Sequence, residues 1–260
     1  MPTEILDNAQ GCDAHLAHPR ISFPSYSWEW TPGQLTAAAE LTLDLCSDLV
    51  EQGWILKDAT PLNVLFNGPR PVFVDILSIE RRDPENALWL AYGQFVRTFL
   101  LPLAAHKYLG WPLSTSLTKR DGYNPCDLYP ALGLIRLLRE PLRSLVTFPR
   151  LLERRAPTRR STMVRRSPPA ALAILKHTLS SLRRSLRMLR TPEARSQWSQ
   201  YHETAVHYSD EDTARKFNFV RACISSSKPR TVLDIGGNTG TFSRLAAQEG
   251  DRGPVRPNRD

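Results

Sequence analysis

The residues best suited to chemistry lie near the end of the sequence, in the stretch TVLDIGGNTGTFSRLAA at positions 231–247. Two apolar residues and Asp234 precede a short turn rich in glycine, and an amphipathic run follows it. Glycines let the backbone approach a ligand closely, and the N-terminus of a following helix presents free N–H groups. The order D-x-G-x-N-x-G does not fit the dinucleotide fingerprint G-x-G-x-x-G. The pattern predicts a strand, a ligand-binding turn and a helix.

This turn resembles motif I of the class I S-adenosylmethionine-dependent methyltransferases, in which an acid precedes G-x-G-x-G. An asparagine stands here where that motif has its middle glycine. The resemblance implies that the turn wraps the methionine part of S-adenosylmethionine and that the acid orients it through hydrogen bonds. It carries over as cofactor-binding positions Asp234, Gly236, Gly237, Asn238 and Gly240. Neither the catalytic residues nor the methyl acceptor can be read from it.

A second set of polar residues could hold a hard cation, because carboxylate and amide oxygens suit Mg²⁺. Asp58 and Asn63 precede a predicted hairpin, and Asp75 follows it. The order resembles the catalytic segment of protein kinases and aminoglycoside kinases, which implies that Asp58 accepts a hydroxyl proton while Asn63 and Asp75 hold Mg²⁺. No glycine-rich loop and no strand lysine precede the segment. We therefore expect a kinase-like fold fragment, with active phosphoryl transfer as a less favoured alternative.

A third candidate lies near the N-terminus, where Cys12, His15 and His18 recur at every third residue. A metal site would usually need a fourth ligand and a rigid frame, and neither is visible in this segment. We interpret the segment as irregular and assign it no metal. The four cysteines of the chain include no C-x-x-C pair, which argues against a zinc ribbon and against a disulfide framework.

The elements around the second set are well marked. Thr31 and Gln34 have the spacing of a capping box, and Gly53 is a natural terminator, so we expect a helix over residues 31–53. The next apolar runs, NVLF and PVFVDI, flank an Asn-Gly pair. This arrangement predicts a β-hairpin at about residues 64–76.

A further helix is expected over residues 87–108. Its apolar run is interrupted by Arg97, Pro102, His106 and Lys107, which indicates a buried core helix and not a membrane span. The N-terminal residues lack the basic and then apolar pattern of a secretory signal. We therefore expect a cytoplasmic protein.

The net charge of +8 is concentrated in residues 136–190, which hold fifteen lysines and arginines and two glutamates. Leucines follow a spacing of three and four in the second part of this segment, and they are Leu172, Leu175, Leu179, Leu182, Leu186 and Leu189. We expect an antiparallel helical hairpin in which these leucines face the segment that begins near residue 128. An alternative is a module that binds nucleic acid or another anion, although one aromatic residue and no known motif make a solvated or paired face the favoured interpretation.

A broader resemblance covers residues 21–247. It is to a bacterial family of class I methyltransferase-like proteins, some of which bear nodulation-protein names. These proteins join a kinase-reminiscent region, a basic helical region and a C-terminal methyltransferase domain. The implied fold is α+β and mostly helical, with regions at 1–125, 126–192 and 193–260, the last being the start of a Rossmann-like domain.

The end of the sequence departs from that family. The stretch RGPVRPNRD has two prolines and three arginines, so it cannot form a parallel core strand. A doubly wound cofactor domain needs several further strands and helices. We therefore expect a truncated domain that does not bind S-adenosylmethionine appreciably, in a methyltransferase family member that is inactive as this chain.

Overall fold

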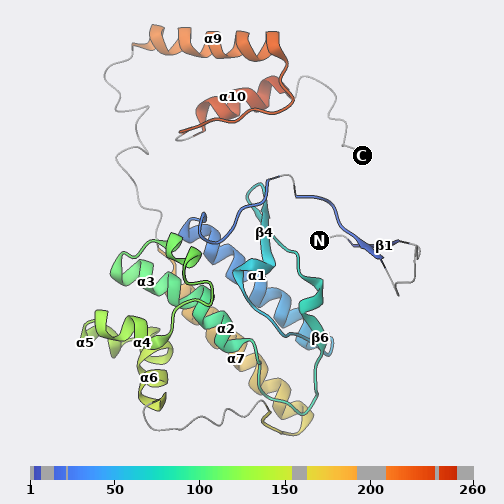
Figure 1. Cartoon of the computed structure of the whole chain (residues 1–260), viewed down its shortest axis with the longest axis vertical. Helices are drawn as coiled ribbons and strands as arrows, with labels where there is room; N and C mark the ends of the chain where they lie inside the picture. Colours follow the sequence, from blue (N-terminus) through green and yellow to red (C-terminus); the bar gives the residue numbers. More distant parts are fainter. Residues whose placement is uncertain are drawn as a thin grey trace. The chain divides into compact units, whose positions relative to one another are not determined.

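The computed structural model describes residues 3–6, 15–21, 23–153, 163–191, 209–237 and 240–250. These residues form a mostly helical α+β structure with small two-stranded sheets, which agrees with the predicted fold class (Figure 1). The chain divides into two compact units, Met1–Pro192 and Glu193–Asp260, which are described separately below. The residues on which the expected truncation rests, 251–260, lie outside the described ranges.

The N-terminal unit holds helices between short strands and single helical turns. Its helices are α1 (Pro32–Glu51), α2 (Tyr92–Phe95), α3 (Leu101–Leu109), α4 (Pro125–Leu128), α5 (Leu134–Leu137), α6 (Phe148–Glu153) and α7 (Pro168–Leu189). Its 3-10 turns are η1 (Pro61–Asn63), η2 (Ile76–Ser78), η4 (Leu113–Leu117) and η5 (Tyr129–Ala131), and its π segments are η3 (Val96–Leu100) and η6 (Arg143–Thr147). Its strands are β1 (Glu4–Leu6), β2 (His15–Ala17), β3 (Trp54–Leu56), β4 (Val64–Asn67), β5 (Arg70–Phe73) and β6 (Ile79–Arg81).

The start of α1 shows why the sequence predicts it so clearly. The Gln34 backbone N–H donates to the Thr31 hydroxyl at 3.2 Å, and the Thr31 N–H donates to the Gln34 side-chain oxygen at 2.9 Å. These bonds satisfy N–H groups that have no partner inside a helix. The helix predicted over residues 31–53 is confirmed, and it buries an apolar face that includes Leu35 and Leu43.

Two antiparallel strand pairs follow α1. β4 and β5 form the predicted hairpin, with Val64 opposite Phe73. β3 pairs with β6, so the hairpin lies between two strands that are themselves paired. The hairpin predicted over residues 64–76 is confirmed, although its second strand ends at Phe73. The Asp75 side chain accepts a hydrogen bond from the Leu77 backbone N–H and caps η2, so the chain turns where the strand was expected to continue.

The helix expected over residues 87–108 forms as a continuous run of α2, η3 and α3. It begins at Tyr92, later than expected, because the residues before it form hydrogen bonds other than those of a helix. The Asn86 side chain accepts a hydrogen bond from the Leu88 N–H, and the Trp89 indole donates to the Leu56 carbonyl at 2.7 Å. Among the described helices, none is long and apolar enough to cross a membrane.

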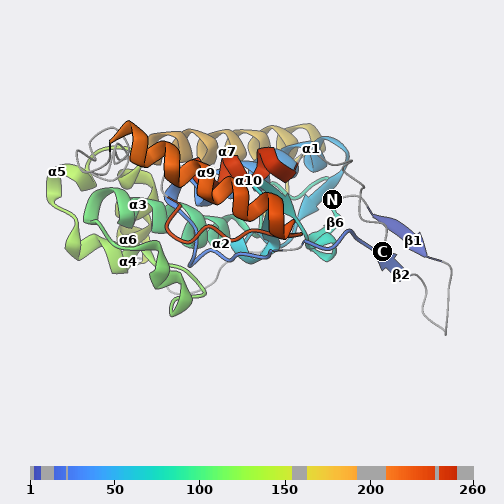
Figure 2. The same ribbon diagram turned by 90° about the horizontal axis from the view of Figure 1, so that it is seen from above.

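α7 is the predicted basic helix with a buried leucine face. Five of its leucines expose 3% of their surface or less, and they are Leu175, Leu179, Leu182, Leu186 and Leu189. Its main partner is α1, and it also contacts α3 and η3 (Figures 1 and 2). The prediction that these leucines face the segment after residue 128 is therefore wrong. One hydrophobic core runs through residues 1–125 and 126–192 and joins these two regions.

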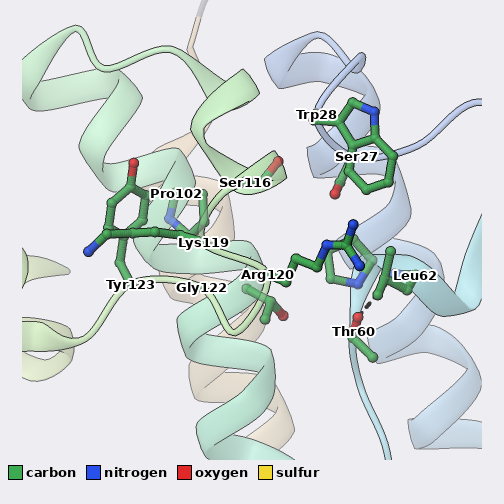
Figure 3. Close-up of a pocket in the computed structure, with 12 residues that line it drawn as sticks. Ser27, Trp28, Thr60, Leu62, Pro102, Ser116, Lys119, Arg120, Gly122 and Tyr123 are labelled. Atoms are coloured by element: carbon green, nitrogen blue, oxygen red, sulfur yellow. Dashed lines mark hydrogen bonds between the residues drawn. The ribbon is translucent and has the colours of Figure 1, made fainter.

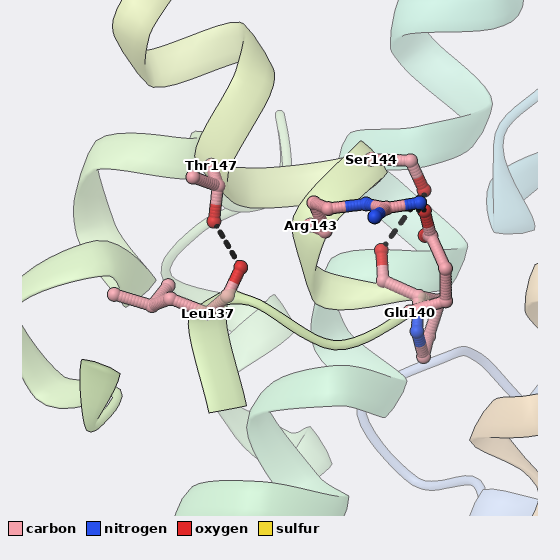
Figure 4. A network of polar contacts seen from close by, with 6 residues as sticks. Leu137, Glu140, Arg143, Ser144 and Thr147 are labelled. Atoms are coloured by element: carbon pink, nitrogen blue, oxygen red, sulfur yellow. Dashed lines mark hydrogen bonds and ion pairs between the residues drawn. The ribbon is translucent and has the colours of Figure 1, made fainter. Parts of the chain in front are cut away.

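The elements from α4 to α6 form short helical pieces instead of the long helix that a hairpin with α7 needs. The Thr147 hydroxyl donates to the Leu137 carbonyl at 2.7 Å, and Glu140 accepts hydrogen bonds from Arg143 at 3.0 Å and Ser144 at 2.7 Å (Figure 4). These bonds fold the chain back between α5 and η6. Desolvation alone would raise the pKa of Glu140, but the hydrogen bonds from Ser144 and Arg143 hold it below its usual value.

Cys46 lies in the middle of the α1 core face, and burial raises the pKa of its thiol to about 12, despite an opposing hydrogen bond from the Leu56 backbone. We expect the native protein at pH 8 to react with a thiol reagent at the exposed Cys126 and Cys223 but not at Cys46.

The raised pKa of Cys46 also makes stability depend on pH, because the folded state keeps the thiol proton up to a higher pH than the unfolded state does. The stabilising contribution of the thiol is therefore complete below pH 9 and is lost as the pH rises toward 12. Peptide mapping after labelling, and urea unfolding at several pH values, measure both effects; rapid native labelling of Cys46 would contradict its burial.

The C-terminal unit contains two described helices, α9 (Asp210–Ser227) and α10 (Thr241–Gly250). The Ser209 hydroxyl caps α9 by accepting a hydrogen bond from the Asp212 N–H at 3.1 Å. Arg221 on α9 forms an ion pair with Glu249 on α10 at 3.2 Å. This ion pair joins α9 to α10, the helix that follows the glycine turn.

Candidate functional site

The glycine turn before α10 adopts a conformation that favours glycine at two positions. Gly236 has a φ of 73° and Gly240 has a φ of 74°, both in the left-handed region. The Gly240 N–H donates to the Gly237 carbonyl at 2.7 Å and closes the turn. Asn238, the other turn position of the candidate set, lies outside the described residues. Gly236 and Gly240 therefore adopt a backbone conformation that residues with a side chain rarely adopt.

Asp234 lies against this turn. The Ser243 hydroxyl on α10 donates to one oxygen of the Asp234 carboxylate at 2.6 Å. A Cβ atom placed on Gly237 would lie 2.7 Å from the same oxygen, so any side chain at that position would displace the carboxylate. The structure thus brings together Asp234, Gly237 and Ser243, and the last of these was not predicted. A serine three residues after the final glycine, in the first turn of the expected helix, is the signal that could have indicated it.

A shallow groove lies beside the turn. It is lined by residues 229–232, by Asp234 and by Ser243 and later residues of α10. The stretch predicted as a strand, 231–234, pairs with no strand among the residues the structure describes. Val232 and Leu233 therefore keep 54% and 78% of their surfaces exposed. The turn and the helix of the predicted unit are present, whereas a Rossmann-like sheet is not part of the described structure.

The kinase-like set lies in the N-terminal unit, around the hairpin of β4 and β5. The Lys57 N–H donates to the Ser78 carbonyl at 2.8 Å, and the Val74 N–H donates to the Asn63 carbonyl at 2.9 Å. These backbone bonds bring the segment before the hairpin next to the segment after it. The predicted positions Asp58, Asn63 and Asp75 consequently belong to neighbouring loops.

Two members of this set are joined through a serine that the sequence analysis missed. The Asn63 amide donates to the fully buried Ser78 hydroxyl at 3.0 Å, and that hydroxyl donates to the Asp75 carboxylate. The other carboxylate oxygen of Asp75 accepts from the Leu77 N–H. This network satisfies its members without a bound ion. The Asp58 carboxylate is half-buried and forms no hydrogen bond within the described part of the chain.

No group of three or more histidine, cysteine, aspartate or glutamate side chains with metal-binding geometry occurs among the described residues. Of the N-terminal candidates, Cys12 and the side chain of His15 lie outside what is described. The ring of His18 contacts the Thr3 hydroxyl at 3.3 Å.

The basic face of α7 is partly paired within its own unit. Arg183 contacts Asp44 at 2.7 Å, and Lys176 contacts Glu51 at 2.6 Å. Arg190 forms a further ion pair with an acid of α1. Part of the positive charge of residues 136–190 is thus offset by acidic side chains on α1, which agrees with the interpretation of a paired face.

The chain is similar to one characterised protein, nodulation protein NoeA of Rhizobium meliloti (strain 1021). The two are 31% identical over 242 residues. The match covers 90% of this chain and 50% of NoeA, so the chain spans about half the length of this relative. No protein-family model and no solved structure matches the chain.

The alignment is long enough to include most of both units. It is therefore more informative than the glycine turn alone, because a turn of this kind also occurs in unrelated strand–turn–helix segments. It supports the predicted resemblance to proteins with nodulation names.

Proposed function

We propose that the C-terminal unit carries the methionine-binding turn of an S-adenosylmethionine-dependent methyltransferase. The observation that supports this most directly is the packing of Asp234 over Gly237. The turn leaves no room for a Cβ atom on Gly237 next to the Asp234 carboxylate, and a backbone without a side chain at this point allows a ligand to approach closely. The similarity to nodulation protein NoeA supports a role for this chain in nodulation.

The residues present fit one end of this cofactor. Ser243 holds one oxygen of Asp234, which leaves the other oxygen to accept a hydrogen bond from the ammonium group of the methionine part. Free N–H groups in the first turn of α10 can donate to its carboxylate. When bound, the cofactor supplies an electrophilic methyl group, and these residues bind and orient it.

The test is an NMR titration of the isotope-labelled protein with S-adenosylmethionine. Because the turn contacts only one end of the cofactor, we expect weak binding, with a Kd of about 1 mM, which corresponds to ~4 kcal/mol. Amide shifts should be concentrated in residues 234–243. Both Asp234→Ala and Gly237→Val should abolish them, the first by removing the acceptor and the second by displacing it.

Glu211→Ala is the matched control, because it removes the same charge from an α9 residue outside the groove. It should leave the titration unchanged. Shifts that spread away from the turn, or that survive Asp234→Ala, would contradict the proposal.

A further inference from the structure

A small cavity lies in the N-terminal unit. Its walls come from the loop before α1, the segment between Asp58 and Asn63, the start of α3 and the loop that follows η4 (Figure 3). Its volume of about 20 Å³ is enough for one or two water molecules, and it opens to solvent. The polar groups on its walls come from segments far apart in the sequence, so the cavity is a product of the fold.

Ser27 is a buried residue on these walls, and Thr98 is buried to the same extent. The exposed fraction of Ser27 is 8%, and its side chain forms no hydrogen bond within the described part of the chain. The Ser27 oxygen is not an enclosed polar atom, so it can be reached from the cavity and can donate to a ligand there.

The guanidinium of Arg120 is a second group at the cavity that has no hydrogen-bond partner within the described part of the chain. Figure 3 shows its guanidinium between Ser27 on one side and Thr60 and Leu62 on the other. It forms no ion pair or hydrogen bond among the described residues. The neighbouring Lys119 differs, because it is paired with Asp127 at 3.0 Å. Within the described ranges, Arg120 is therefore a positive charge at the cavity without a counter-charge.

Thr60 completes the donor set. Its oxygen accepts a hydrogen bond from the Leu62 N–H at 3.0 Å, which leaves its hydroxyl proton available. None of the carboxylates that the structure describes lines the cavity. Hydroxyl and guanidinium donors without an acidic group are complementary to an anion with several acceptor oxygens.

We propose that Ser27, Thr60 and Arg120 form a binding site for a tetrahedral oxyanion, the phosphate group of a small phosphate monoester. One phosphate oxygen enters the cavity and accepts from Ser27 and Thr60. The exposed Arg120 side chain, which has no partner to release, closes over the other oxygens. This site belongs to the N-terminal unit and does not depend on the proposed methyl-transfer function.

Inorganic phosphate is the probe that tests the site, by calorimetric titration of the full chain at constant ionic strength. We expect saturable binding that chloride does not reproduce. Arg120→Ala and Ser27→Ala should each weaken it at least tenfold, because each removes a donor to a charged ligand. Arg70→Ala is the matched control, since it removes an exposed arginine from the β4–β5 hairpin, and it should leave the affinity unchanged.

Neither variant removes a hydrogen bond or an ion pair among the described residues, so the midpoints of thermal unfolding without phosphate should stay close to that of the parent protein. Equal phosphate affinity in the parent and in Arg120→Ala would overturn the proposal, as would an equal effect of Arg70→Ala. Two further arms identify the source of the phosphate group, glycerol 3-phosphate and phosphatidylcholine vesicles that contain phosphatidic acid. We expect the soluble ester to compete with phosphate; competition by the vesicles alone would show that the oxyanion is a lipid headgroup.

Discussion

Replacing Gly122 with alanine is expected to destabilise the N-terminal unit by about 2–5 kcal/mol. Gly122 has a φ of 78°, which an L side chain rarely adopts, and a Cβ atom at this position would lie 2.1 Å from the Arg97 carbonyl oxygen. The obstacle is backbone, so no side-chain rotation relieves it. The same carbonyl accepts a hydrogen bond from the Tyr123 N–H at 3.0 Å, which holds the loop against η3. Urea denaturation followed by circular dichroism measures the loss.

Gly110→Ala separates the two causes of this effect. Gly110 ends α3 with a φ of 71°, but nothing lies within 4 Å of the Cβ atom it lacks. It should therefore cost only about 1 kcal/mol, from the backbone conformation alone. Similar losses in the two variants would mean that the loop after η4 moves away from Arg97 without penalty, and the described close approach would then be wrong.

The features that could be predicted from the sequence are those encoded within a few residues. The capping box of α1 needs Thr31 and Gln34 only, and the hairpin of β4 and β5 needs one Asn-Gly pair between two β-prone runs. Each of these elements forms close to the predicted bounds because its hydrogen bonds are made between near neighbours.

The partner of the basic helix could not be read in the same way. A leucine face at helical spacing predicts that α7 is buried on one side, but it is equally compatible with any apolar surface. Residues far away in the sequence determine which surface α7 packs against. α1 has an apolar face and, beside it, acids such as Asp44 and Glu51. The turn between α5 and η6 also breaks the helix that was expected to be the partner.

The polar sites show the same division between local and long-range information. The resemblance to kinase segments places Asp58, Asn63 and Asp75 around one hairpin, and the structure places them there. Ser78, which joins two of them, lies three residues after Asp75 in the sequence and resembles an ordinary turn serine. The cavity at Ser27 and Arg120 depends on loops that are more than ninety residues apart, and no local pattern indicates it.

The second large effect is expected for Leu186→Ala in α7, which should lose about 2–5 kcal/mol of stability. Leu186 is fully buried in the core cluster that also contains Leu43 of α1. Alanine has the higher helix propensity, so a loss of stability cannot come from weakening α7 itself. It must come from the cavity that the missing methyl groups leave between packed helices.

Ile174→Ala is the control on the same helix, because its side chain remains 41% exposed. It should cost less than about 1 kcal/mol. The decisive measurement is whether Leu186→Ala lowers the midpoint of the unfolding transition monitored by tryptophan fluorescence, to which the buried Trp30 and Trp89 contribute. If α7 packs on α1, the tryptophan signal and the helical signal shift together. A fall in helical signal that leaves the tryptophan transition in place would show that α7 is not part of this core, and that its leucines serve another partner.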